Sequence, residues 1–180
     1  MILSVTSTVA DTYTFSETIE PSTSAVISVK LTADGQYLGV ALTSGEIFLY
    51  QRNGISFDLN QSFTTSFALS NFHMTDDHKM ISAIANIDFV ICELNTVSQY
   101  NCTFYQLPNN APPNAFMQGI MVTNDHQFLI ISIAGHNSIY VYRRSGTIYQ
   151  LNQTIVQSIR PYDVKITQDH QILAATGWGT

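Results

Sequence analysis

The sequence repeats one pattern four times, and this repeat constrains the fold more than any other feature. Each copy has an apolar residue, a threonine, any residue, an aspartate, a turn residue and then an apolar run. The copies are LTADGQYLGV from Leu31, MTDDHKMISA from Met74, VTNDHQFLII from Val122 and ITQDHQILAA from Ile166. Their threonines are separated by 43, 48 and 44 residues. A period of roughly 40–50 residues with strand-like content is typical of β-propeller blades.

Each copy begins a unit that is expected to form four short strands, A to D. In the first unit the expected strands are Ser28–Thr32, Tyr37–Leu42, Glu46–Tyr50 and Phe57–Phe63. Strands B and C are near-continuous apolar runs. This pattern predicts that both of their faces are buried between stacked blades.

The two ends of the sequence resemble the two halves of one further unit. Residues 1–20 align with a C–D hairpin, since YTFSETI matches YQLNQTI near Leu151, and residues 162–180 supply strands A and B. Counted through both ends, the step from Thr167 to Thr32 is 45 residues, within the range of the internal steps. The sequence therefore predicts a single all-β domain over residues 1–180, a β-propeller of four four-stranded blades whose last blade is completed by strands from both termini. Its predicted parts are residues 1–20, 28–64, 71–106, 118–156 and 162–180.

Two long segments, TADGQYLGVALTSGEIFLYQR and TNDHQFLIISIAGHNSIYVYRR, resemble blades of the WD-repeat-like and lactonase-like propeller superfamily. The shared pattern is an apolar strand, a polar-Asp-Gly turn, an apolar run and then Ile-x-Val-Tyr. The Gly-His and Trp-Asp dipeptides of true WD repeats are missing. The resemblance covers essentially the whole chain and implies a rigid ring whose loops bind proteins or small molecules.

Four aspartates occupy the same place in the four copies: Asp34, Asp77, Asp125 and Asp169. They are followed by Gly35, His78, His126 and His170. We expect the aspartates to form turns, because an Asp side chain hydrogen-bonds to its own backbone two residues on, and we expect the histidines to adopt positive φ. The alternative is a metal site built from Asp-His pairs. Turns of different blades are expected to lie far apart, so no metal or other cofactor is predicted.

Cys92 and Cys102 lie ten residues apart, symmetric about Val97 in the C–D hairpin of the second unit. Strands that turn at Val97 place them nearly opposite each other, at a separation that a disulfide can bridge. With two cysteines in the chain the alternatives are one bridge or two free thiols. Because the hairpin is expected to place the two cysteines opposite each other, we favour the bridge.

Three Asn-x-Ser/Thr sequences begin at Asn60, Asn101 and Asn152. All three fall on strand D, the outermost strand of a blade. The side chains of Asn60 and Asn152 are expected to point outward, because they alternate with Leu59 and Leu151. If the protein is secreted, these asparagines are candidates for N-glycosylation.

The charge balance disfavours several partners. Charged residues make up 11% of the chain, against roughly 25% in an ordinary domain, and the net charge is −6 with seven Lys and Arg. A nucleic-acid partner is therefore not expected.

The longest apolar run, Phe128–Ala134, has the length of a strand and predicts no membrane insertion. The first residues, MILSVTSTVA, lack the basic region of a signal peptide. The low charge, which is common in extracellular β-proteins, the sequons on strand D and the possible hairpin disulfide lead us to expect an extracellular or cell-surface protein. A cytoplasmic location is the alternative.

The sequence contains no catalytic motif of the Gly-x-Ser-x-Gly, His-Glu-x-x-His or Walker type. Four aromatic residues are candidates either for a ligand-binding surface or for packing between blades: Tyr50, Tyr140, Tyr142 and Trp178. The longest loop, Leu107–Gly119, is expected to protrude on the binding face.

We therefore expect a non-catalytic interaction scaffold whose partners are other proteins or copies of itself. The alternative is a lactonase-like propeller enzyme or a propeller that binds small ligands. The split blade can close within one chain, on one neighbour or in a filament, unless the 180 residues are part of a longer propeller.

Overall fold

The computed structural model describes residues 3–9, 12–19, 23–108 and 116–179, with side chains from Ile19 to Trp178 within these ranges. These residues form sixteen β-strands and one short 3-10 turn, η1, at Ala134–His136. The strands make three four-stranded sheets and two two-stranded sheets. The predicted all-β class is confirmed, and η1 is an addition that the sequence pattern did not indicate.

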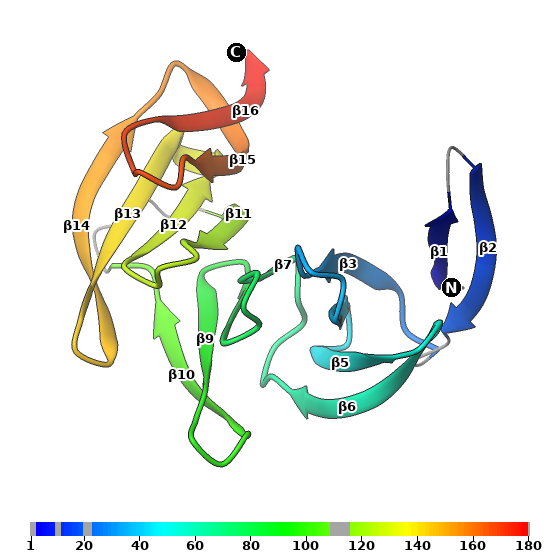
Figure 1. Ribbon diagram of the computed structural model, residues 1–180. Helices are drawn as coiled ribbons and strands as arrows, with labels where there is room; N and C mark the ends of the chain where they lie inside the picture. Colours follow the sequence, from blue (N-terminus) through cyan, green and yellow to red (C-terminus); the bar gives the residue numbers. More distant parts are fainter. Residues whose placement is uncertain (1–2, 10–11, 20–22, 109–115, 180) are drawn as a thin grey trace. The chain divides into compact units, whose positions relative to one another are not determined.

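The chain divides into two compact units, residues 1–68 and 69–180. The first unit holds an N-terminal hairpin of β1 (Leu3–Val9) and β2 (Thr12–Ile19), which pair with each other (Figure 1). It also holds the first blade, with the strand order β3-β4-β5-β6. The strands of the first blade are β3 (Val26–Leu31), β4 (Tyr37–Leu42), β5 (Glu46–Asn53) and β6 (Ser56–Thr64).

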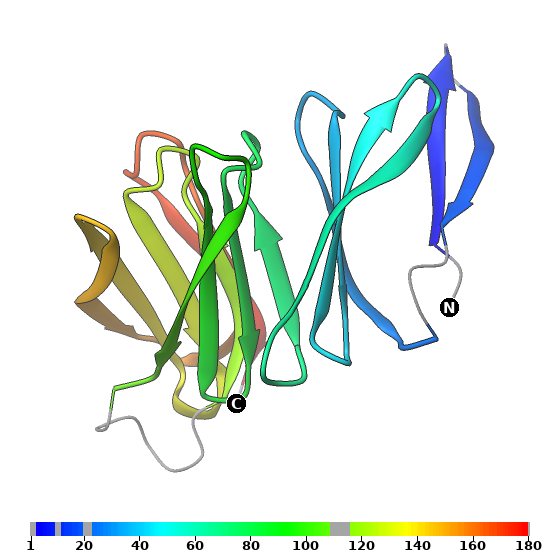
Figure 2. The same ribbon diagram turned by 90° about the horizontal axis from the view of Figure 1, so that it is seen from below.

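The second unit contains two more blades and a C-terminal hairpin, which follow one another from green to red in Figure 2. The second blade consists of β7 (Asn71–Met74), β8 (Met80–Ala85), β9 (Asp88–Leu94) and β10 (Tyr100–Gln106). The third blade consists of β11 (Met117–Val122), β12 (Phe128–Ile133), β13 (Ser138–Ser145) and β14 (Ile148–Val156). The C-terminal hairpin pairs β15 (Ile159–Ile166) with β16 (Leu173–Gly179).

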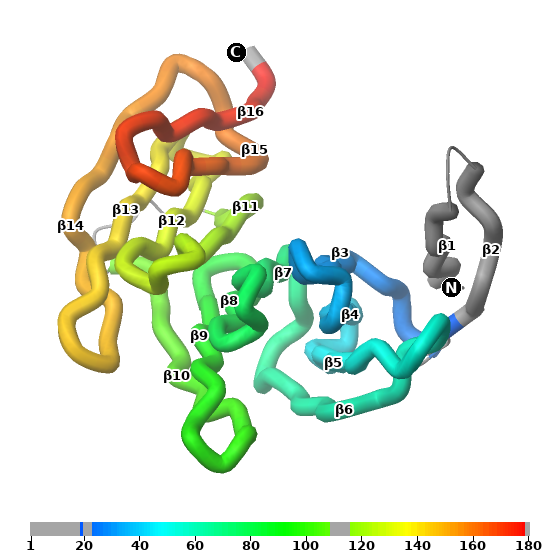
Figure 3. The backbone as a smooth tube through the Cα atoms, in the orientation of Figure 1, coloured from blue at the N-terminus to red at the C-terminus, as the bar shows by residue number. Residues whose placement is uncertain are grey.

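Within the second unit, neighbouring sheets pack through their first strands. Strand β11 contacts β7 and β8 of the second blade on one side and β15 of the C-terminal hairpin on the other (Figure 3). Gly119 of β11 makes the close approach to β15 feasible, since a Cβ there would lie 2.7 Å from the carbonyl oxygen of Tyr162. The sequence had placed Gly119 in the long loop, but β11 already begins at Met117; residues 109–115 of that loop lie outside the described residues.

Strand β12 shows why the apolar runs are continuous. Leu129, Ile131 and Ile133 belong to the core between the second and third blades. Ile130, which points to the opposite face, belongs to the core shared with the C-terminal hairpin. All four are fully buried. The prediction that the middle strands are buried on both faces is therefore confirmed for this blade.

The two cysteines stand directly opposite each other in the hairpin of β9 and β10. Their Cα atoms are 4.0 Å apart and their sulfur atoms are joined at 2.12 Å. Cys92 is fully buried, whereas Cys102 lies on the exposed outer strand. The bridge thus ties the outermost strand of the second blade to its buried neighbour.

We expect reduction of this bridge to destabilise the protein by about 2–3 kcal/mol, because closing a loop of this length restricts the unfolded chain. The measurement is urea unfolding of the native protein with and without a reductant, together with intact mass to count free thiols. The double variant Cys92→Ala/Cys102→Ala is the control and should not respond to reductant. Two free thiols in protein purified without reductant would contradict the bridge.

Candidate functional site

The four repeated turns share one hydrogen-bond pattern. In each, the threonine hydroxyl donates to the aspartate Oδ1, at 2.5–2.7 Å in Thr32–Asp34 and the three equivalent pairs. The same Oδ1 accepts the backbone N–H two residues on, at 3.0–3.1 Å. The threonine Oγ1 in turn accepts the backbone N–H five residues on, at the start of strand B or, for Ile172, directly before it. Each aspartate thus holds its own turn closed.

The residue after each aspartate adopts positive φ, as predicted. Gly35 has φ 68°, and His78, His126 and His170 have φ of 52°, 61° and 58°. In the second and third blades a strand-D tyrosine donates to the carbonyl oxygen of this residue. Tyr149 reaches that of His126 at 2.7 Å, and Tyr100 makes the same bond to His78. Burial raises the pKa of Tyr149, so its hydroxyl remains a donor.

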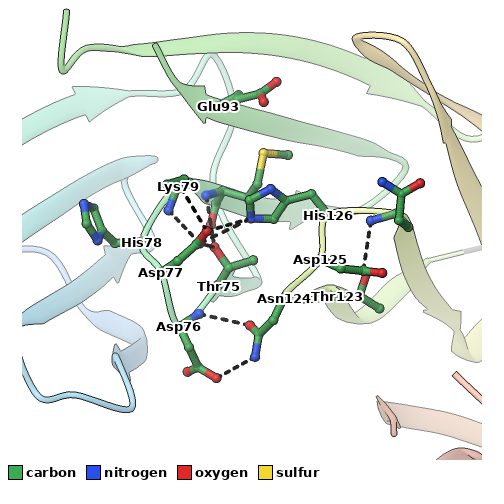
Figure 4. A network of polar contacts seen from close by, with 12 residues as sticks. Thr75, Asp76, Asp77, His78, Lys79, Glu93, Thr123, Asn124, Asp125 and His126 are labelled. Atoms are coloured by element: carbon green, nitrogen blue, oxygen red, sulfur yellow. Dashed lines mark hydrogen bonds and ion pairs between the residues drawn. The ribbon is translucent and has the colours of Figure 1, made fainter. Parts of the chain in front are cut away.

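Turns of neighbouring sheets touch, contrary to the expectation that they lie far apart (Figure 4). His126 Nε2 of the third blade lies 3.2 Å from both carboxylate oxygens of Asp77 in the second blade. His170 Nε2 lies 3.4 Å from one carboxylate oxygen, Oδ2, of Asp125 in the third blade. The first strands of these blades pack side by side, so the turns that follow them are also neighbours.

A second bond pair strengthens the contact between the second and third blades. Asn124 Oδ1 accepts the backbone N–H of Asp76 at 3.0 Å, and Asn124 Nδ2 donates to Asp76 Oδ2 at 2.7 Å. Figure 4 shows this pair beside the Asp77–His126 contact. Both contacts therefore hold the same two turns together.

The contacts lower the pKa of three of the turn carboxyls. Partial burial alone raises the pKa of Asp77, but hydrogen bonds from Thr75 and from the N–H of Lys79, together with His126, outweigh it and lower the pKa. The same balance lowers the pKa of Asp125. For Asp169 the hydrogen bond from Thr167 is the main cause of a lowered pKa. These three aspartates therefore remain ionised hydrogen-bond acceptors.

The described residues contain no group of three or more His, Cys, Asp or Glu side chains arranged to hold a metal ion. Each turn histidine that contacts a neighbouring turn faces one aspartate. These contacts can join neighbouring sheets through an aspartate and a histidine. Among the described residues they do not gather the several ligands that a metal site requires.

Next to these turns, a groove of about 400 Å³ lies between the second and third blades. Met80, Ile91 and Tyr149 form its buried part. Its lining residues from the β9–β10 hairpin are Glu93, Leu94, Asn95, Thr96, Asn101, Thr103 and Tyr105, and from the third blade Thr147 and Tyr149. This volume is within the roughly 300–1,000 Å³ of small-molecule sites.

An ion pair crosses from one blade to the other at the edge of the groove. Arg144 Nη2 lies 2.8 and 2.7 Å from the two carboxylate oxygens of Glu93. The hydrogen bond to Glu93 raises the pKa of the Arg144 guanidinium. Glu93, the single charged side chain that lines the groove, therefore forms an ion pair with Arg144.

The three sequon asparagines are exposed on outer strands. Asn60 and Asn152 each occupy the extra residue of a β-bulge, in β6 and β14, where the register with the preceding strand shifts. Asn101 lies in the regular strand β10, opposite Glu93, and lines the groove. The sequence pattern predicted the same kind of position for all three asparagines. In the structure Asn101 lines the groove, whereas Asn60 and Asn152 lie at bulges.

The four candidate aromatics do not form one surface. Tyr50, Tyr140 and Tyr142 are buried. They therefore fit the alternative of packing rather than that of a ligand-binding surface. Trp178 is 72% exposed on β16, with the ring of Tyr162 at 6.1 Å between centroids. Tyr105 and Tyr149, which the sequence did not single out, line the groove.

No protein-family model and no curated protein sequence matches this chain. Solved structures do resemble it. A protein from Lactobacillus plantarum gives a TM-score of 0.81 at 16% identity over 98% of this chain. The β-propeller domain of Cps50 (Swd1) from Myceliophteria thermophila gives 0.69 at 13% identity over 86%. A candidate 6-phosphogluconolactonase from Bacteroides fragilis gives 0.76 at 16% identity over 97%.

The chain therefore has the β-propeller fold, as its resemblance to WD-repeat-like and lactonase-like propellers predicted. It spans about half the length of these structures, 57%, 50% and 57% of their chains. Among the described residues, no helix combines the length and apolar character needed to cross a membrane.

The contact between turns gives a pH-dependent prediction. Asp77→Ala should destabilise the protein by about 1–2 kcal/mol, because it removes two hydrogen bonds and the partner of His126. Asp77→Asn, which keeps the acceptor Oδ1 and loses the charge, should cost less. Since folding lowers the pKa of Asp77, its ionic contribution is present above the unfolded value of about 3.9 and is lost as pH falls through the lower folded value.

Urea unfolding of the native protein and Asp77→Asn at pH 7 and at pH 3 measures this. The stability difference between the two proteins should be smaller at pH 3 than at pH 7. An equal difference at both pH values would show that the charge of Asp77 plays no part.

Proposed function

We propose that this chain is a non-catalytic interaction module built on a β-propeller, and that its partner is a second copy that docks on β16. The observation that carries the proposal is the exposure of β16 at positions that complete blades bury. The alternative occupants of that surface are outcomes of the experiment below.

Strand β16 corresponds to strand B of the complete blades. At the position of Thr176 these blades have Ala41, Ile84 and Ser132, all fully buried, whereas Thr176 is exposed. The position of Ala174 gives the same contrast, since Ser82 and Ile130 are fully buried there.

The opposite face of β16 is already covered. Leu173 and Ala175 pack against the core of the third blade. The exposed face with Trp178, and the edge away from β15, are what remains for a partner. In the complete blades that edge pairs with strand C, as β4 pairs with β5.

The N-terminal hairpin is of the type that pairs with a strand-B edge. By sequence it is a C–D hairpin, and β1 pairs with β2 as β5 pairs with β6. Reciprocal docking of two copies supplies strands C and D to both exposed edges and so removes them.

We further propose an extracellular location. The disulfide of Cys92 and Cys102, the exposed Asn60, Asn101 and Asn152, and a charged fraction of 11% support it. Disulfides persist mainly in oxidising compartments.

The test is native mass over a hundredfold range of concentration. We expect a dimer of twice the 20.0 kDa chain mass, and we expect Thr176→Lys/Trp178→Lys to shift it to monomer, because burial of two ammonium groups is costly. Ile55→Lys, at an exposed turn of the first blade, is the matched control and should remain dimeric.

A monomer at all concentrations would overturn docking of a second copy. If the unchanged protein is monomeric and binds a synthetic C–D hairpin in a Thr176-dependent way, the occupant is further propeller sequence on the same chain. Fibres that Thr176→Lys/Trp178→Lys dissolves would mean head-to-tail docking.

The second candidate function is a lactonase-like or small-ligand-binding propeller, favoured by the groove and by the candidate 6-phosphogluconolactonase from Bacteroides fragilis. We expect purified protein not to accelerate hydrolysis of 6-phosphogluconolactone above the buffer rate, because Glu93 is paired with Arg144 and the turn aspartates already accept hydrogen bonds. A rate enhancement that Glu93→Gln abolishes would establish the enzyme instead.

A further inference from the structure

The groove between the second and third blades contains a rigid aromatic ring. The ring of Tyr105 stacks on Phe89 with centroids 4.9 Å apart and planes 5° apart. Its hydroxyl oxygen accepts the backbone N–H of Tyr149 at 3.4 Å. One face of the ring is thus covered by Phe89, and the half-buried ring lines the groove. A flat apolar surface held in this way suits a ligand that has a flat apolar face of its own.

Neutral hydrogen-bonding side chains line the same groove as this ring. Asn101, Thr103 and Thr147 line the groove, and their side chains make no hydrogen bond to another described residue. They come from both blades, two from β10 and one from the turn before β14. Glu93, the charged residue of the lining, is neutralised by Arg144. The groove therefore favours an uncharged ligand with several hydroxyl or amide groups.

We propose that this groove binds a neutral sugar residue, with its apolar face on Tyr105 and its hydroxyls on Asn101, Thr103 and Thr147. The C–H face of a sugar ring packs on aromatic rings, while its hydroxyls bind amides and alcohols. The proposal does not depend on the dimer proposed above, because no lining residue belongs to β16.

Two sources can supply the sugar. One is a free saccharide. The other is an N-glycan of the chain itself, because Asn101 is both a groove residue and the first residue of the sequon Asn101-Cys102-Thr103. In that case Asn101 is the attachment point, and the sugar hydroxyls bind Thr103 and Thr147. Asn152 provides the internal comparison, since its bulge position on β14 is not part of the groove lining.

The first arm uses oxidised protein refolded from bacteria, in which Asn101 carries no glycan. Amide NMR signals are followed during titration with glucose, N-acetylglucosamine, cellobiose and N,N′-diacetylchitobiose. We expect saturable shifts at Asn101, Thr103 and Thr147 with at least one of these sugars. Tyr105→Leu should weaken binding by about threefold to tenfold.

Thr147→Trp should fill the groove and abolish the shifts. Ile55→Trp is the matched control, because Ile55 occupies the equivalent turn of the first blade and is 80% exposed. It should leave binding unchanged.

The second arm uses protein secreted by yeast, with site-resolved mass spectrometry of endoglycosidase trimming. A glycan on Asn101 that lies in the groove should be trimmed more slowly than one on Asn152, and Thr147→Trp should make the two rates equal. Binding in the first arm alone identifies a free saccharide, and slow trimming alone identifies the chain's own glycan. If no sugar gives saturable shifts and Asn101 is either unglycosylated or trimmed as fast as Asn152, the proposal is overturned.

Discussion

The structure depends on burial of both faces of its middle strands. Strand β12 places Leu129 and Ile131 against the second blade and Ile130 against the C-terminal hairpin. Fully burying one such side chain contributes about 1.5–3 kcal/mol, and this gain is available only when a sheet lies on each side. A sheet of this type is therefore incomplete alone, which explains the contrast between β12 and the half-exposed β16.

The polar turns complement that apolar packing. Side-chain packing between sheets has little directional preference, whereas hydrogen bonds require defined geometry. The Asp77–His126 contact and the Asp76–Asn124 pair fix how the second blade meets the third at one end. The bond from Tyr149 to the carbonyl of His126 then ties the outer strand to the same turn. The groove lies beside these bonds, so its lining residues are held by both blades.

Much of this architecture could be predicted because it is local. The threonine-aspartate turn needs residues within five positions of one another, and strand β4 has the bounds that its apolar run predicts. Cys92 and Cys102 are opposite each other because a hairpin turns midway between them. The partner of Asp77 was missed because it lies 49 residues away, one repeat further along the chain. The repeat itself contained that signal, since Asp34, Asp77 and Asp125 are each followed by a turn histidine one period later.

The sequence by itself determined the blade: four short strands, their turns, and middle strands apolar on both faces, since these follow from hydrogen bonds and side-chain alternation within about 40 residues. Only the tertiary structure decided which blade surfaces meet. It joined the turns of successive blades, buried three of the candidate aromatics, and placed Asn101, but neither Asn60 nor Asn152, in the groove with Tyr105 and Thr147. The physical reason is that such contacts depend on how one sheet packs against the next, which local propensity does not specify.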